Sequence, residues 1–157
     1  MSARLEYDRR YLALTPLDYQ NGNRMNADVG LGDAKWIDVK VEASDGSTSW
    51  ERVDPCFSDL ELHDLVRWLY ALGSGDSGDA SFEGMEPSLK FKAIWGVGRV
   101  RLNAIFTLEL RPEAGPSHNA KDPKVVSFDV PRSAIEQFAG SLAADLSRFP
   151  EPRNRGR

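Results

Sequence analysis

The segment Ser88–Arg111 reads SLKFKAIWGVGRVRLNAIFTLELR, and its apolar residues alternate with other residues on both sides of Gly96–Gly98. Alternation with a period of two places every second side chain on the same face of a β-strand. Glycine readily adopts the positive φ values that a tight turn requires. The segment therefore predicts two antiparallel strands joined at the glycines, each with one face in a core. The side chains expected in that core are Leu89, Phe91, Ala93, Trp95, Val100, Leu102, Ala104, Phe106, Leu108 and Leu110.

The side chains between these core positions are mostly polar, so we expect the other face of each strand to meet water, as antiparallel sheets allow. The same alternation recurs at Trp36–Ala43, which predicts another strand. The water-facing side of the sheet is therefore expected to contain Trp36, Asp38, Lys40, Lys90, Lys92, Ile94, Arg101, Asn103, Ile105 and Thr107.

Further strands and a long loop are predicted on the N-terminal side of this region. Leu5–Leu17 predicts one or two short strands, and the Asn-, Gly- and Asp-rich segment Tyr19–Lys35 predicts a loop. A turn at Ser44–Ser47 is expected to join the strand at Trp36–Ala43 to a second strand at Ser49–Val53. These segments predict antiparallel pairing between neighbours in the sequence, because every connection is short enough to allow it.

Two amphipathic helices are predicted from apolar residues that recur at helical spacing. Ser58 and Glu61 fit a capping box, in which each side chain accepts a hydrogen bond from a free backbone amide of the first turn. Gly73 is expected to end this first helix in a left-handed conformation. The second helix is expected to begin at Pro131 and to end before Pro150.

The order of these elements predicts a single α+β domain over residues 1–150. Ala80–Glu83 and Val126–Val130 add two short strands, so the expected architecture is an antiparallel sheet of about six strands with two amphipathic helices packed on one face. Residues 151–157 are expected to form a polar basic tail. A chain of 157 residues is long enough to support one such core without a metal or a disulfide.

The composition excludes several classes of protein. Cys56 is the only cysteine, so the chain has no internal disulfide and no cysteine metal cluster. No run of 18 apolar residues occurs, which argues against a membrane span, and the first residues do not read as a signal peptide. We therefore expect a cytoplasmic protein.

No pattern in the sequence predicts a catalytic site, a metal site or a cofactor. His63 and His118 are the only histidines, and both are expected to have surface or structural roles. Cys56 is expected to be a buried thiol, and Gly96–Gly98 lacks the rest of a dinucleotide-binding fingerprint. The acidic residues between Asp76 and Glu86 do not have the spacing of a calcium loop.

Charge is distributed unevenly along the chain, although the formal net charge is only −4. Asp45–Glu86 contains ten acidic residues against two arginines, a balance of −8, whereas Pro87–Arg111 contains five basic residues against one glutamate, a balance of +4. Such asymmetry is typical of proteins that bind a charged partner. An ordinary solvated surface with uneven charge is the alternative.

Several segments resemble the WapI-like immunity proteins of bacteria. They are Lys35–Val39 after the Asn/Gly-rich loop, Asp54-Pro55 leading into Leu60–Leu69, Phe82–Phe91, the strand that ends in Leu108-Glu109-Leu110, and Phe149-Pro150. It is the order and spacing of these segments, rather than any single one, that carries the resemblance. Members of this family are small cytoplasmic partners of contact-dependent or polymorphic toxins.

The resemblance implies a non-enzymatic protein that neutralises a cognate protein toxin through a protein–protein interface, with no nucleic acid or membrane as partner. Nuclease toxins have basic substrate-binding surfaces, and the acidic segment suits such a partner. The candidate partner-binding residues are Trp50, Asp76, Asp79, Glu83 and Glu86, with Trp50 as an aromatic anchor. The alternative is a small-molecule or metabolite binder that uses the open sheet face or an internal cavity. Self-association and the identity of the toxin stay open.

Overall fold

The computed structural model describes residues 3–20, 34–75, 78–112 and 122–151. Eight strands and two α-helices lie within these ranges, with a 3-10 turn after β7 and another after α2. In chain order the elements are β1 (Ala3–Tyr7), β2 (Arg10–Tyr19), β3 (Trp36–Ser44), β4 (Ser49–Ser58), α1 (Asp59–Gly73), β5 (Ser81–Glu83), β6 (Leu89–Gly96), β7 (Arg99–Phe106), η3 (Leu108–Leu110), β8 (Lys124–Pro131), α2 (Arg132–Asp145) and η4 (Leu146–Arg148).

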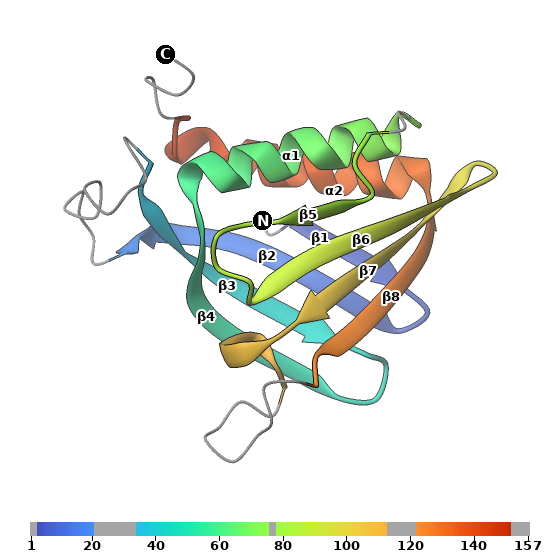
Figure 1. Cartoon of the computed structure of the whole chain (residues 1–157), viewed down its shortest axis with the longest axis horizontal. Helices are drawn as coiled ribbons and strands as arrows, with labels where there is room; N and C mark the ends of the chain where they lie inside the picture. The colour runs from blue at the N-terminus through green and yellow to red at the C-terminus, as the bar shows by residue number, and fades with distance from the viewer. Residues whose placement is uncertain (1–2, 21–33, 76–77, 113–121, 152–157) are drawn as a thin grey trace.

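The strands form two antiparallel sheets, each with its four strands in sequence order. The first sheet contains β1–β4, and the second contains β5–β8 (Figure 1). The α+β prediction is confirmed, but the expected single sheet of about six strands is replaced by two sheets of four. Helix α1 separates the two runs of strands in the sequence, and each strand then pairs only with its neighbours along the chain.

The helices lie side by side and cover the open side between the two sheets (Figure 1). Helix α2 contacts β1 and β2 of the first sheet and β8 of the second, while α1 contacts β4. The end of α1 approaches the start of α2 closely at Gly73, where an added Cβ would lie 2.5 Å from Cγ of Glu136. Gly73 is the last residue of α1. The left-handed conformation that was expected at Gly73 occurs instead at Gly75, whose φ is +83°.

One hydrophobic core contains the inward side chains of both sheets and both helices. Phe106 of β7 is fully buried, and its ring makes an edge-on contact with the Trp50 ring of β4, with centroids 5.2 Å apart. Phe57 of β4 and Phe82 of β5 form a second ring contact between the sheets. The two sheets therefore share one core.

The alternation predicted for β6 and β7 is confirmed from Leu89 to Phe106, but it stops there. Leu108 has φ +53° and is 39% exposed, because the chain turns into η3 instead of continuing the strand. Ile105, expected to face water, is only 9% exposed. At the hairpin turn only Gly98, with φ +68°, has the positive φ expected of both glycines.

Candidate functional site

Four carboxylates lie within electrostatic range of one another's charges where the edges of the two sheets approach each other. Asp54 of β4 is half-buried, and burial together with the negative charges of Glu109, Glu86 and Asp38 raises its pKa from 3.8 to about 6. Burial disfavours the charged form, and each neighbouring carboxylate adds repulsion. We call this group, Asp38, Asp54, Glu86 and Glu109, the acidic seam.

The acidic seam is positioned by hydrogen bonds from β4 to the chain around η3. Trp50 Nε1 donates to the carbonyl oxygen of Leu110 at 2.9 Å. One Arg52 guanidinium nitrogen donates to the carbonyl oxygens of Arg111 and Pro112, at 3.1 and 2.7 Å. These bonds fix the turn that contains Glu109 against the strand that contains Asp54.

Glu86 is positioned by Glu61, whose carboxylate has two structural roles. One oxygen accepts from the Ser58 backbone amide at 3.0 Å and completes the predicted capping box of α1. The other accepts from the Met85 backbone amide at 2.7 Å. Gly84 permits this contact, since an added Cβ would lie 2.9 Å from the Glu61 carboxylate. The connection between β5 and β6 is therefore attached to the start of α1.

The sequence-predicted partner-binding residues do not all lie on the surface. Asp79, Glu83 and Glu86 are exposed, and the Asp79 carbonyl accepts a hydrogen bond from Trp68 Nε1 at 2.9 Å. Asp76 lies outside the described residues. Trp50 is only 7% exposed, so the expectation that it serves as a surface anchor is wrong. Its alternation with exposed Ser49 and Glu51 places it on the core side of β4.

Sequence reasoning did not include Asp38, Asp54 and Glu109 in the site. Asp54 was expected to follow the strand at Ser49–Val53, whereas β4 continues to Ser58, and Glu109 was expected to lie in the strand that ends in Leu110. Their proximity depends on the contact between β4 and η3, which joins residues about fifty positions apart. A local pattern does not record such a contact; only the high acid content of Asp45–Glu86 pointed to this region.

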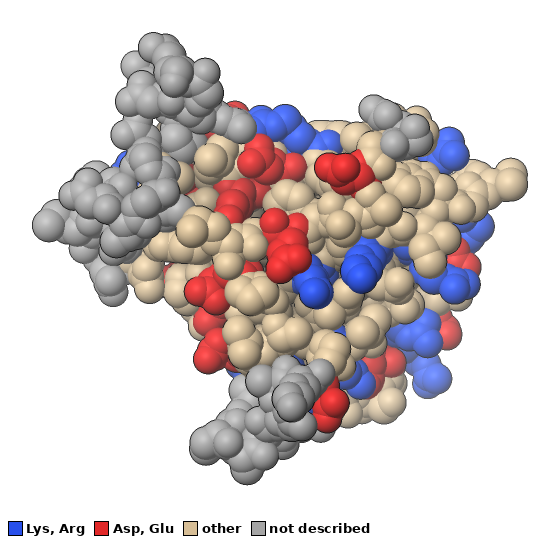
Figure 2. Space-filling model, viewed as in Figure 1, with Lys and Arg blue, Asp and Glu red and all other residues tan. Residues whose placement is uncertain are grey.

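Acidic and basic side chains occupy different parts of the same face (Figure 2). Acidic groups gather over β4, the β5–β6 connection and the start of α1, and basic groups lie over β6 and towards the β6–β7 turn (Figures 1 and 2). The basic residues that face outward from β6 and β7 are Lys90, Lys92, Arg99 and Arg101, which we call the basic strip. Arg99 pairs with Asp129 at 3.3 Å.

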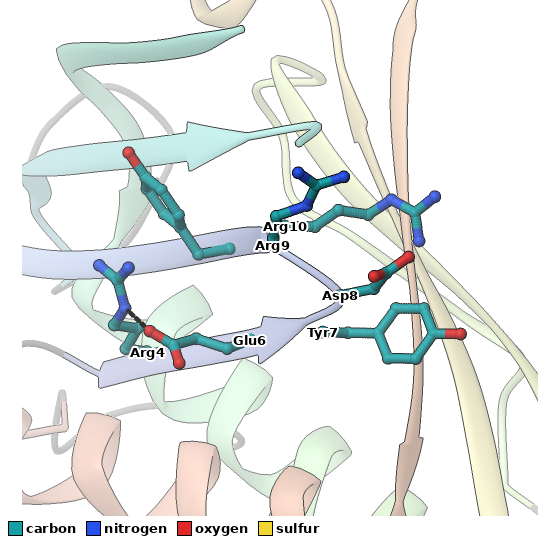
Figure 3. Close-up of a pocket in the computed structure, with 7 residues that line it drawn as sticks. Arg4, Glu6, Tyr7, Asp8, Arg9 and Arg10 are labelled. Carbon is teal, nitrogen blue, oxygen red and sulfur yellow. Dashed lines mark hydrogen bonds and ion pairs between the residues drawn. The ribbon is translucent and has the colours of Figure 1, made fainter. Parts of the chain in front are cut away.

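The hairpin of β1 and β2 carries an open hollow of about 280 Å³ (Figure 3). Arg4 pairs with Glu6 and lies over the Tyr11 ring, and Arg10 lies near the Tyr7 ring. The remaining lining residues are Asp8 and Arg9, so most of the hollow is charged. Small-molecule pockets usually enclose their ligand and have mostly apolar walls. The hollow does not have this character.

The remaining reactive side chains have structural surroundings. Cys56 is fully buried, and burial raises the pKa of its thiol, which keeps the thiol protonated. His63 Nε2 lies 2.6 Å from the carbonyl oxygen of Phe149 and connects α1 to the residue that follows η4. Within residues 3–20, 34–75, 78–112 and 122–151, no three Asp, Glu, His or Cys side chains are grouped as a metal site requires. In the same ranges, neither helix has the length and apolar character needed to cross a bilayer.

Comparison with models of protein families finds a match. The family described as the immunity protein WapI-like family matches residues 4–150. No curated protein and no solved structure matches the chain. The matched range begins in β1 and ends just after η4, so it includes both sheets and both helices.

Proposed function

Because the chain belongs to the WapI-like immunity protein family, we propose that it is a non-enzymatic cytoplasmic protein that neutralises a cognate toxin domain by binding it. The family match over residues 4–150 carries this proposal. The mode of action is a protein–protein interface that covers the active site of the toxin or blocks access to it. Neither nucleic acid nor membrane is required as a partner.

The proposed contact surface is the acidic face formed by Asp79, Glu83 and the acidic seam. No Lys or Arg in the described part of the chain forms an ion pair with Asp79, Glu83 or Glu86. Their charge is therefore available to a partner. A toxin that cleaves nucleic acid has a basic substrate-binding surface, because phosphate groups dominate its substrate. An acidic face is complementary to that surface.

Cell protection tests the function itself. A candidate toxin domain, chosen from reading frames that neighbour the gene, would be expressed in bacterial cells with and without the full chain. We expect growth only when the chain is present, together with recovery of a stable complex of the two proteins from the lysate. Growth arrest despite soluble chain, with no complex, would exclude the immunity role for that toxin.

Association kinetics test the proposed surface. The triple variant Asp79→Asn, Glu83→Gln and Glu86→Gln should bind the purified toxin domain about tenfold more slowly at low salt, because electrostatic steering raises the on-rate. Added salt should reduce the difference. The melting temperature should change little, since these side chains are exposed and have no ion pair.

A matched control removes three negative charges from the outer face of the first sheet. These changes are Glu6→Gln, Glu42→Gln and Glu51→Gln, and they should leave the on-rate close to that of the unmodified chain. If both triple variants slow binding equally, only net charge matters and the proposed surface is wrong.

A further inference from the structure

The outer face of the second sheet has opposite charges at its two ends. Its acidic half consists of Glu83 on β5 and Glu86 in the β5–β6 connection, next to Asp54 and Glu109 of the acidic seam, and its basic half is the basic strip. Glu83 lies opposite Lys90 in the register of β5 and β6, so the two halves adjoin (Figures 1 and 2). The face is therefore a surface dipole.

Much of this face is uncovered in the described structure. Both helices lie on the core side of the sheets. Ile94, two positions after Lys92 on β6 and opposite Arg101 of β7, is 58% exposed. Neither Lys92 nor Arg101 forms an ion pair or a side-chain hydrogen bond with any described residue. The centre of the face thus combines an exposed apolar side chain with cations that have no partner within the described chain.

A face with this charge distribution is complementary to itself after a two-fold rotation. The rotation places the acidic half of one copy against the basic half of the other, and the same contact then occurs a second time. Isologous contacts of this kind close a dimer, whereas a head-to-tail contact would continue into a chain. Charge pairs fix the orientation, while apolar area around Ile94 is removed from water.

We propose that the outer face of the second sheet is a dimer interface, in which the acidic half of each copy, with Glu83 and Glu86, contacts the basic strip of its partner. The occupant of this face is a second copy of the chain, and the contact is weak and salt-sensitive because both charged groups are largely exposed. The dimer does not depend on the proposed toxin binding. If both hold, the dimer covers Glu83 and Glu86, so toxin and second copy compete.

Sedimentation of the purified full chain without toxin tests the interface. At about 20 mM salt, we expect a concentration-dependent species with twice the 17.5 kDa mass of one chain, which should dissociate in about 0.5 M salt as the Debye length shortens. A monomer at all concentrations in low salt would overturn the proposal. Larger species that grow with concentration would overturn the two-fold arrangement.

Charge reversal makes the test specific. One variant carries Lys92→Glu with Arg101→Glu, and a second carries Glu83→Lys with Glu86→Lys, each at exposed positions. Each variant alone should weaken dimerisation at least about tenfold, because like charges then face each other. An equal mixture should regain a 1:1 dimer, since the acidic faces of one variant now match the basic faces of the other.

The control reverses two cations on the opposite side of the molecule, Arg4→Glu and Lys40→Glu, in the outer face of the first sheet. This variant has the same change in net charge as the Lys92 and Arg101 variant and should still dimerise. Loss of dimer in the control, or a mixture that stays monomeric, would show that specific pairing across this face does not occur.

Discussion

At the scale of single residues, the surroundings of Asp45 lower its pKa, whereas the surroundings of Asp54 raise its pKa. Asp45 accepts hydrogen bonds from the Ser47 and Thr48 backbone amides, both at 2.8 Å, and pairs with Lys124 at 2.5 Å. The Lys124 contact, followed by these amides, lowers the pKa of Asp45. Asp54 has the reverse situation, because burial and three carboxylates raise its pKa to about 6. One aspartate stabilises a turn, while the other is charged at neutral pH at a cost to the fold.

The raised pKa of Asp54 makes the free energy of unfolding depend on pH. Between about pH 4 and 6 the folded chain keeps the Asp54 proton while the unfolded chain has released it, so this group lowers the free energy of unfolding as pH rises. The shift corresponds to about 3 kcal/mol, which we reduce to about 1–2 kcal/mol because Asp54 is partly exposed. Asp54→Asn should therefore stabilise the chain by this amount at pH 7 and by almost nothing near pH 4, as measured by urea unfolding.

Asp45→Asn is the matched control with the opposite sign. It should destabilise the chain by about 1 kcal/mol at pH 7 through the weakened turn and the lost ion pair. The loss should shrink as pH falls below about 4, where the folded-state advantage of the charged Asp45 carboxylate disappears. A pH-independent gain for Asp54→Asn would contradict the repulsion assigned to the acidic seam.

At the scale of elements, β6 and β7 have one buried face and one open face. Phe106→Ala should lower the free energy of unfolding by about 3–5 kcal/mol, because Phe106 is fully buried and joins the two sheets. Ile94→Ala should change it by only about 0.5 kcal/mol, since that side chain is mostly exposed. Urea midpoints that fall equally for both variants would mean that the facing of these strands is wrong.

The β6–β7 hairpin also shows how far sequence reasoning reaches. Period-two alternation places Phe91, Leu102 and Phe106 in the core without any knowledge of the fold, because it reports only on the nearest neighbours in a strand. The capping box at Ser58 is equally local and equally predictable. Ile105 shows where this reasoning fails. Its position in the alternation predicts a side chain that faces water, but its tertiary surroundings bury it.

The acidic seam could not be predicted from local sequence patterns for the same reason. Glu109 comes near Asp54 because Leu108 leaves the strand with a positive φ and the following turn bonds to β4. Glu83 and Glu86 were proposed from charge density alone and are exposed, whereas Trp50 was misplaced because composition does not show the face of β4 on which it lies. Local pattern thus predicts the elements, and the contacts between them determine the site.

At the scale of the whole molecule, both proposed interfaces depend on a fixed relation between the two sheets. The acidic seam combines β3 and β4 of the first sheet with the β5–β6 connection and η3. The sheets are joined through Trp50 and Phe106, through Phe57 and Phe82, and through α2, which contacts β1 and β8. A change in the angle between the sheets would separate these carboxylates and alter the charge pattern of the face.

The two sheets should therefore unfold as one cooperative unit, and native-state hydrogen exchange tests this directly. Leu14 of β2 is fully buried in the first sheet, so Leu14→Ala should lower global stability by about 2–5 kcal/mol. In a single unit, the slowest amides of β7 in the second sheet should lose the same free energy of opening as those of β2. If the sheets were independent, protection in β7 would stay unchanged. Ile94→Ala, which removes an exposed side chain, is the control and should leave protection in both sheets as it was.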